Sequence, residues 1–556
     1  MTAARGSMRE ASTTTSWPRW LEICLVLGSL VAFAVWSYLR APVGGDFAWS
    51  DAPRHALNGI FVHDLVAHLG EGDPRAYAVD YYLRYPALTI LFYPPLFSGV
   101  LAIAYELFGF SHQVAQATVL SFAVVLGGFT YLLARRWMSQ GFALAAALLL
   151  VGAPELTVWS RQVMLDLPTY AWLVGSAWCF TGWLQQQRPR QLYGTAVLVV
   201  LALYTKQTPL FIFPAMLAGL LAGPGLAVLR RRHVWVTVLL MMVALIPLVV
   251  LQLKFGQVNS ASAIGSARAD LSRLTLAAWT YYLEIMPSQL GWPTLVLAGV
   301  YLVGAAVRPS WRLPRPIMVY LLSWLVLGYL MFSFIMVREP RHDLMVLMPL
   351  ALFAALALQR LAEGWLSGRA YAAAMTAVPV LCFAHAGAEL EIHPVQYVDG
   401  YAQAVNYVIE RAPANSVVMF SGNRDGTFIF DVRASKRTDL AIARADKMLF
   451  RVAIERERGI EDRGVDTAQL RQRFVDHGIR YLVYDPDFWQ DQPSMAALRS
   501  LLADKSSFTL EETFQLRANF NNQDKRLQIY RFEGELRNPP LPLSAELVGV
   551  GMKLQK

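Results

Sequence analysis

The carboxylate best placed for chemistry in this sequence belongs to Asp51. Asp46 lies five residues before it, and Arg54 and His55 follow it by three and four residues. A carboxylate beside an arginine stays ionised and can accept a proton from a hydroxyl group, while the arginine can bind a phosphate. The structural alternative is that Asp51 only caps a helix that has Pro53 in its first turn.

Two further charged residues lie in short polar turns. Asp166 precedes Pro168 where an apolar stretch begins, and Lys206 follows another apolar stretch. Asp166 could bind a hydroxyl-bearing substrate or position Asp51, and Lys206 could bind a phosphate. The alternatives are that Asp166 caps its helix and that Lys206 reaches along the membrane interface toward water.

A third turn carries Arg338, Arg341 and His342. Its arginines are further candidates for a phosphate site, and Arg341 is the stronger one. The alternative is an exposed turn in which both arginines pair weakly with Glu339 and Asp343.

His55 raises the question of a metal. Together with Asp51 and Asp166 it could hold a divalent cation. A lone histidine on an interfacial helix more commonly makes a polar contact, so we assign no metal ligand and no cofactor, and keep a divalent metal as the alternative.

The composition shows what must position these residues. The chain has 556 residues, of which 55% are hydrophobic and 16% charged, and its mean hydropathy is +0.37. A chain this apolar contains stretches that are too long for a soluble core and belong in lipid. The composition therefore predicts a polytopic α-helical membrane protein. The net charge of +9 comes with arginines in short loops between apolar stretches. That is typical of membrane orientation, so we expect no nucleic-acid partner.

Twelve apolar stretches are candidates for membrane spans. If all twelve crossed, Arg135, Arg136 and the arginines from Arg308 to Arg315 would lie outside, against the positive-inside rule. The rule is satisfied if the stretch 88–107 lies against the outer surface without crossing. We therefore expect eleven spans, in a range of about 11 to 13. The twelve stretches are 20–39, 88–107, 114–134, 141–156, 165–184, 192–204, 207–222, 234–253, 289–307, 316–337, 343–360 and 370–387.

This topology predicts three parts, with every candidate residue on the outer face. Residues 1–19 form a cytoplasmic N-terminus, and residues 20–387 form a transmembrane domain. The transmembrane domain has an outer segment at 40–113 and an outer loop at 254–288, which could cover the site. Residues 388–556 are less apolar, and alternating helix and strand patterns predict an α/β domain on the outer face.

Five short motifs follow one another along the chain. They are Asp51-x-x-Arg54-His55-Ala56, Tyr93-Pro94-Pro95-Leu96, Leu165-Asp166-Leu167-Pro168, Tyr204-Thr205-Lys206, and Arg341-His342 with Pro349. Their order resembles that of the family 39 glycosyltransferases, which include the lipid A aminoarabinose transferase and the protein O-mannosyltransferases. The resemblance covers residues 20 to about 360 and departs from the family at Ala52, His55, Phe92-Tyr93 and Gln207. These departures concern the identity of the substrate.

The resemblance implies a GT-C fold and an inverting glycosyltransferase. Its donor would be a sugar on a polyprenyl phosphate, and its acceptor a hydroxyl of a lipid, glycan or protein. The enzyme would lie in a bacterial-type inner membrane, with its active site and C-terminal domain on the periplasmic side. Asp51 and Asp166 are the catalytic candidates. The candidates for binding the donor phosphate or sugar are Asp46, Arg54, His55, Tyr93, Lys206, Arg338, Arg341 and His342.

Two other classes of protein remain as alternatives. A transporter or lipid flippase should have ionisable residues in the middle of its spans. Here they gather at the outer ends, and the stretches 114–134 and 316–337 contain none. A non-catalytic cell-envelope assembly protein would bind a partner through residues 398–540 and would not need Asp51.

Overall fold

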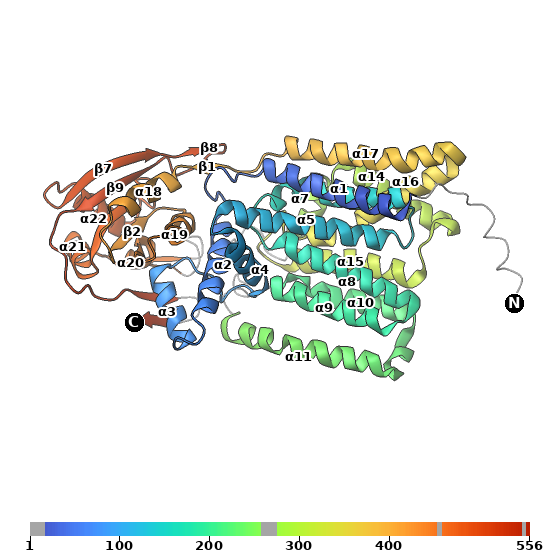
Figure 1. Cartoon of the computed structure of the whole chain (residues 1–556), viewed down its shortest axis with the longest axis horizontal. Coiled ribbons are helices and arrows are strands. Elements are labelled where there is room, and N and C mark those ends of the chain that lie inside the picture. The colour runs from blue at the N-terminus through green and yellow to red at the C-terminus, as the bar shows by residue number, and fades with distance from the viewer. Residues whose placement is uncertain (1–16, 257–274, 453–458, 548–551, 556) are drawn as a thin grey trace, which may run out of the picture.

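The molecule consists of two parts that lie end to end along its longest axis (Figure 1). Helices make up the first part, and strands with helices make up the second. This is the predicted fold class: a polytopic helical membrane domain followed by an α/β domain. The computed structural model describes residues 17–256, 275–452, 459–547 and 552–555.

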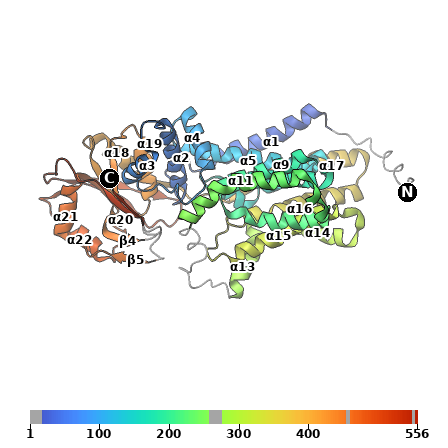
Figure 2. The same cartoon turned by 90° about the horizontal axis from the view of Figure 1, so that it is seen from below.

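The long helices of the first part run side by side (Figures 1 and 2). Each of the eleven stretches predicted to cross the membrane coincides with a helix or a bent helix pair. The bundle contains α1 (Arg19–Leu39), α5 (His112–Ala134), α6 (Gln140–Val151), α7 (Pro154–Ser160), α8 (Asp166–Gln186), α9 (Pro189–Thr205), α10 (Ile212–Ala222), α11 (Arg232–Phe255), α13 (Leu276–Leu290), α14 (Trp292–Val307), α15 (Arg315–Phe334), α16 (Met348–Trp365) and α17 (Gly368–Ile392), with short 3₁₀ turns η1 (Thr208–Phe211), η2 (Gly225–Arg230), η4 (Pro309–Trp311) and η5 (Leu344–Val346).

Length and hydropathy identify the helices that can cross a membrane. Within the described residues, α1, α5, α11, α15 and α17 qualify, and the bent pairs α6–α7 and α13–α14 raise the number to seven if each pair is one span. Only 17% of the most apolar window of α11 is buried, whereas every residue of α6 is buried. Apolar side chains thus cover the outside of α11, as expected for a helix that faces lipid. The chain is a multi-pass membrane protein.

Glycines let α6 approach α17 closely. A Cβ atom on Gly141 would lie 1.7 Å from the carbonyl oxygen of Met375, and one on Gly152 would lie 2.2 Å from the Cβ of Ala386. The α6–α7 pair bends by 64° just after Gly152. This contact brings α7 and the start of α8 to the end of the bundle that meets the α/β domain.

Three shorter helices form the segment between α1 and α5: α2 (Ala52–Ala67), α3 (Pro74–Arg84) and α4 (Leu96–Phe108). In Figure 1, α2 runs across the end of the bundle, between the bundle and the α/β domain. The stretch predicted to lie on the outer surface contains α4. Its 13 residues are only about 20 Å long, too short to cross about 30 Å of hydrocarbon. Instead α4 packs on α2, where a Cβ on Gly59 would lie 2.6 Å from the Cβ of Leu101.

The predicted outer loop 254–288 contains more helix than expected. Helix α13 begins at Leu276 and meets α14 at an angle of 111°. Gly291, with φ +78°, lies at this corner. Polar residues such as Glu284 lower the hydropathy of α13, so the sequence reads as a loop although it forms a helix. The rest of the predicted loop, residues 257–274, lies outside the described residues.

The α/β domain is built on a five-stranded mixed sheet in the order β3-β2-β6-β9-β7. Strand β2 pairs in parallel with β3 and β6, and β9 pairs antiparallel with β6 and β7. The elements are β1 (Val398–Asp399), α18 (Tyr401–Arg411), β2 (Val417–Ser421), α19 (Asp425–Ala434), β3 (Ala441–Arg444), α20 (Ala445–Leu449), β4 (Phe450–Val452), β5 (Ile460–Asp462), α21 (Thr467–Asp476), β6 (Ile479–Tyr484), α22 (Pro493–Leu502), β7 (Phe508–Gln515), β8 (Arg517–Ala518), β9 (Arg526–Phe532), β10 (Ser544–Leu547) and β11 (Met552–Gln555).

The two faces of this sheet belong to different cores. Along β2, Val418 and Phe420 pack in the core that continues into the bundle. Val417 and Met419 pack in a separate core with α21 and α22. Side chains alternate between the two faces of a strand, so β2 is buried on both sides and reads as a continuous apolar run.

Helix α19 joins the α/β domain to the bundle by packing on α2. A Cβ on Gly426 would lie 2.9 Å from the Cγ of Pro53, so the glycine allows a close approach of the two helices. Phe430 of α19 meets the ring of Phe47 edge to face, with centroids 5.0 Å apart. The start of α2 is thus held between the bundle and the α/β domain.

Candidate active site

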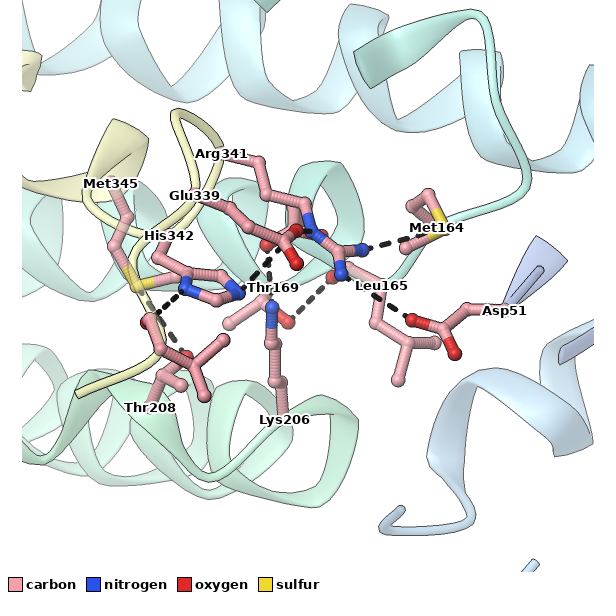
Figure 3. A network of polar contacts seen from close by, with 12 residues as sticks. Asp51, Met164, Leu165, Thr169, Lys206, Thr208, Glu339, Arg341, His342 and Met345 are labelled. Carbon is pink, nitrogen blue, oxygen red and sulfur yellow. Dashed lines mark hydrogen bonds and ion pairs between the residues drawn. The ribbon is translucent and has the colours of Figure 1, made fainter. Parts of the chain in front are cut away.

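Asp51 stands at the N-cap position of α2, but its carboxylate makes no capping hydrogen bond. Instead its Oδ2 accepts a hydrogen bond from Nη2 of Arg341 at 3.3 Å (Figure 3). The Asp51 side chain is 29% exposed and that of Arg341 is 9% exposed. The carboxylate therefore keeps an accessible oxygen while a nearly buried cation holds it.

Arg341 is the centre of the polar cluster. Its Nε donates to the carboxylate of Glu339 at 2.7 Å, and its guanidinium lies 5.5 Å from the ring of Trp49 and 5.0 Å from that of Trp159. Planar contacts of this kind orient an arginine and reduce its exposure to water. Arg341 is thus fixed between carboxylates and aromatic rings, and is not a solvated side chain in an exposed turn.

The charged residues of this cluster shift one another's pKa values. Burial alone would raise the pKa of Asp51, but the positive charges nearby, Arg341 first among them, hold this pKa below its usual value. Burial alone would lower the pKa of Arg341, but Asp166, Glu339 and Asp51 raise it. Asp51 is therefore ionised at neutral pH and able to accept a proton.

Asp166 and Lys206 form the second ion pair of the site. Nζ of Lys206 lies 2.6 Å from Oδ1 of Asp166, and both side chains are largely buried. Asp166 is the first residue of α8, and the hydrogen bond of its Oδ1 is the one from Lys206. Its Oδ2 has no hydrogen-bond partner among the described residues. Neither the helix-cap alternative for Asp166 nor the interfacial alternative for Lys206 describes these contacts.

Neutral aromatic side chains surround the two ion pairs. The rings of His55 and Tyr93 meet edge to face at 4.7 Å, and Nδ1 of His342 donates to the carbonyl oxygen of Val337 at 3.1 Å. Burial lowers the pKa of both His55 and His342 to about 4, so both are neutral at pH 7. The charge of Asp51, and then burial, raise the pKa of Tyr93, so its hydroxyl keeps its proton.

Two residues predicted to bind the donor, Arg54 and Asp46, contact the α/β domain instead. Arg54 forms two hydrogen bonds with the Asp425 carboxylate of the α/β domain, at 3.2 and 3.0 Å. Asp46 accepts hydrogen bonds from the backbone N–H groups of Tyr401 and Ala402, at 2.7 and 3.0 Å, at the start of α18. These contacts differ from the phosphate contacts expected for Arg54 and the sugar contacts expected for Asp46.

Arg338 also points elsewhere. Its Nη2 donates to the carbonyl oxygen of Ser333 at 2.7 Å, near the end of α15. A cation at a helix C-terminus satisfies carbonyl groups that have no partner within the helix. The turn therefore divides its two arginines: Arg338 secures α15 and Arg341 faces Asp51.

Three residues of the cluster were not among the predicted site residues: Glu339, Trp49 and Trp159. Glu339 was considered only as a weak surface partner of the arginines. Its position between Arg338 and Arg341, in the same turn, is the available signal. The tryptophans carry no comparable sequence signal, because Trp159 lies 110 residues after Trp49 and only folding brings the two rings within 5.0 Å.

The candidate metal ligands do not form a set. Among the described residues, no three histidine, cysteine, aspartate or glutamate side chains are grouped so that they could hold a metal ion. Asp51 faces Arg341 and Asp166 faces Lys206, so each carboxylate is matched to a cationic side chain. The donor set proposed from Asp51, His55 and Asp166 therefore does not fit a metal in this arrangement.

The cluster lies where helices begin and end. Asp51 precedes α2, Asp166 begins α8, and Lys206 follows α9. Asp51 and Lys206 lie in the one polar network drawn in Figure 3, and Lys206 contacts Asp166. This placement differs from the mid-span charges expected of a transporter.

Known proteins share the fold. ArnT from Cupriavidus metallidurans bound to undecaprenyl phosphate aligns with a TM-score of 0.60 at 16% identity, over 91% of this chain and 98% of that one. An oligosaccharyltransferase from Archaeoglobus fulgidus in the apo form aligns with a TM-score of 0.53 at 14% identity, over 90% and 75%. The mycobacterial arabinofuranosyltransferase AftD gives 0.51 at 12% identity, over 95% and 42%.

The sequence comparisons add one finding. Residues 93–251 match the family described as dolichyl-phosphate-mannose-protein mannosyltransferase. No curated protein sequence matches the chain. The chain therefore has the GT-C fold, and residues 93–251 in its helical part match the mannosyltransferase family.

Proposed function

We propose that the protein transfers a sugar from a polyprenyl-phosphate donor to a hydroxyl group of a lipid, glycan or protein acceptor, with inversion at the anomeric carbon. The reaction takes place at the outer face of a bacterial-type inner membrane, where the α/β domain also lies. Asp51 is the general base, and Arg341 and Lys206 bind the phosphate of the donor.

The observation that carries this proposal is the contact between Asp51 and Arg341. An aspartate at an N-cap position ordinarily accepts a hydrogen bond from the backbone of its own helix. Asp51 makes no such bond and faces a buried guanidinium instead. The pairing holds an ionised carboxylate and a phosphate-binding group in one place, which glycosyl transfer from a phosphate requires.

The chemistry balances with these residues. The acceptor oxygen attacks the anomeric carbon, and Asp51 takes the proton of the hydroxyl. The bond between the anomeric carbon and the phosphate oxygen breaks, and its electron pair leaves with the lipid phosphate. Arg341 and Lys206 stabilise the charge on this leaving group. A single displacement inverts the anomeric centre and needs no carboxylate nucleophile.

The comparisons support the class of donor. ArnT from Cupriavidus metallidurans was determined bound to undecaprenyl phosphate, and an oligosaccharyltransferase from Archaeoglobus fulgidus was determined with a dolichol phosphate and an inhibitory peptide. Both are polyprenyl phosphates. Arg341 and Lys206 are held here by Asp51, Glu339 and Asp166, and a phosphate can exchange for these carboxylate contacts.

Asp51→Asn tests the proposal. General-base catalysis contributes about 10²–10⁴-fold, so we expect sugar transfer to fall by about that factor in a reconstituted assay while donor binding remains. Asp73→Asn is the matched control, because Asp73 is an N-cap aspartate whose side chain does cap its helix. Wild-type transfer by Asp51→Asn would remove Asp51 from the role of base.

A further inference from the structure

A polar cavity lies in the α/β domain, apart from the Asp51 cluster. Its volume is about 360 Å³, within the range of small-ligand sites. Helices α20 and α21 supply part of the wall, and the hairpin of β10 and β11 supplies the rest. The charged residues and the histidine that line it are Lys447, Arg463, Arg473, His477, Glu546 and Lys553.

Positive charge exceeds negative charge in this cavity. The carboxylate of Glu546 is shared by Arg463 at 3.3 Å and Arg451 at 3.3 Å. Arg473 donates to the carbonyl oxygen of Met448, and Lys447 donates to that of Val452 at 3.2 Å. Within the part of the chain that the structure describes, neither Arg473 nor Lys447 has a carboxylate at ion-pair distance.

Two of the cations that line the cavity, Lys447 and Arg473, have lowered pKa values. Burial, and then Arg444, lower the pKa of Lys447 to about 8. Burial, and then Arg463, lower the pKa of Arg473. Burial disfavours the charged form of both side chains, and Arg463 and Arg473 also repel each other, so an anion that enters the cavity stabilises these cations.

We propose that this cavity binds a phosphate group. Arginine matches the oxygens of a phosphate with two N–H groups, and lysine adds a point charge. Four cationic side chains facing one carboxylate leave more positive charge than one carboxylate ligand would neutralise. A doubly charged oxyanion fits this excess.

The cavity adjoins the contact between the α/β domain and α2. Lys447 and Met448 belong to α20, a helix of five residues. Asp446 of the same helix binds Arg444, which also pairs with Asp425, the partner of Arg54. A phosphate on a sugar or lipid acceptor could therefore be held by the domain that packs on the helix of Asp51.

Titration of the purified full-length protein with inorganic phosphate at constant ionic strength, followed by calorimetry, tests the proposal. Each charge-assisted contact contributes about 1.5–3 kcal/mol, so Arg473→Gln and Lys447→Gln should each weaken binding at least about tenfold. Arg411→Gln is the matched control, because Arg411 lies in the same domain outside the cavity and pairs with Glu410.

Glu546→Gln provides the opposite test. It removes the carboxylate of the cavity, so phosphate should bind more tightly than to the wild type. No detectable binding to the wild type, equal binding by Arg473→Gln and Lys447→Gln, or weaker binding by Glu546→Gln in protein of wild-type thermal stability would each overturn the proposal. These results require no sugar transfer, so they are separate from the test of Asp51.

A parallel titration with a sugar phosphate distinguishes the source of the group. Tighter binding than inorganic phosphate in the wild type, lost in Arg473→Gln, supports a phosphate carried by a glycan. Equal affinity for both supports recognition of phosphate alone. Both results agree with a phosphate site, and in this comparison the absence of binding by either ligand contradicts the proposal.

Discussion

Asp51 and Arg54 lie three residues apart at the start of α2, yet they contact different parts of the molecule. Asp51 faces Arg341 in the turn that follows α15, whereas Arg54 faces Asp425 in the α/β domain. The first contact leaves a partly exposed carboxylate in a polar cluster. The second joins two domains through residues 371 positions apart in the chain. One short motif thus serves both a candidate site and a domain interface.

The comparison shows why motif residues should not all be given one role. Arg54 matches the arginine of the family motif, and the sequence suggested that it binds phosphate. In the structure, the guanidinium that meets Asp51 comes from Arg341 instead. The function of α2 is to hold its first residues between the bundle and the α/β domain.

Arg341→Gln should have the largest effect on the bundle side. It removes both a phosphate contact and the cation that keeps Asp51 ionised, so we expect transfer to fall by about 10²–10³-fold. The positive charge lowers the pKa of Asp51 in the wild type. Its loss should move the acidic limb of the pH–rate profile to higher pH, because the base must be deprotonated. An unchanged acidic limb would contradict the coupling of the two residues.

Asp425→Asn should have the largest effect on the domain side. It leaves Arg54 and Arg444 without their shared carboxylate, and breaking a buried pair destabilises by about 3–5 kcal/mol. The α/β domain should therefore unfold or detach at a lower temperature, measured as a thermal transition. Glu410→Gln is the control, because it breaks a far more exposed pair with Arg411 that contributes less than about 1 kcal/mol. Equal stability of the two variants would argue against a stabilising role of the Asp425 ion pairs between the α/β domain and α2.

Lys206→Ala tests whether Lys206 binds the phosphate of the donor. Losing a charge-assisted contact of about 1.5–3 kcal/mol should weaken binding of a polyprenyl phosphate by about tenfold or more. Lys254→Ala is the control, since Lys254 is an exposed lysine at the end of α11. If both variants bound the lipid as the wild type does, the phosphate site would lie away from Lys206.

The buried histidines predict a smaller effect on stability. His55 and His342 have pKa values of about 4 in the folded protein, below the value of about 6.5 in an unfolded chain. Between these values the unfolded state binds more protons, so stability falls as the pH drops below 6.5. Between pH 7 and pH 5 we expect a loss of about 1–2 kcal/mol per histidine. His55→Asn should reduce this loss, whereas His68→Asn, at a more exposed position, should not.

The fold could be predicted further than the site. Apolar length and the distribution of arginines identified the bundle, and they separated the short α4 from the spans. They missed α13, because Glu284 and its other polar residues lower the hydropathy of a helix that lies at a corner. The alternation of helix and strand patterns also indicated the α/β domain, but not that the side chains of β2 meet two different cores.

Within the site, the sequence grouped the candidate residues on one face of the predicted bundle but did not reveal which of them pair. Asp51, Asp166, Lys206 and Arg341 come from four distant segments, and their ion pairs depend on how α2, α8, α9 and the turn after α15 pack. Asp46 and Arg54 were assigned by proximity to Asp51 in the chain. Their partners lie more than 350 residues away, where no local pattern could reveal them.

The most direct test of the account compares Asp51→Asn with Arg54→Gln in single-turnover sugar transfer at saturating donor. We predict that Asp51→Asn loses transfer by about 10²–10⁴-fold with its thermal stability intact. Arg54→Gln should show the reverse, a clear loss of stability with a much smaller loss of transfer below its unfolding temperature. If Arg54→Gln abolished transfer in a stable protein while Asp51→Asn remained active, the assignment of the two residues would be contradicted.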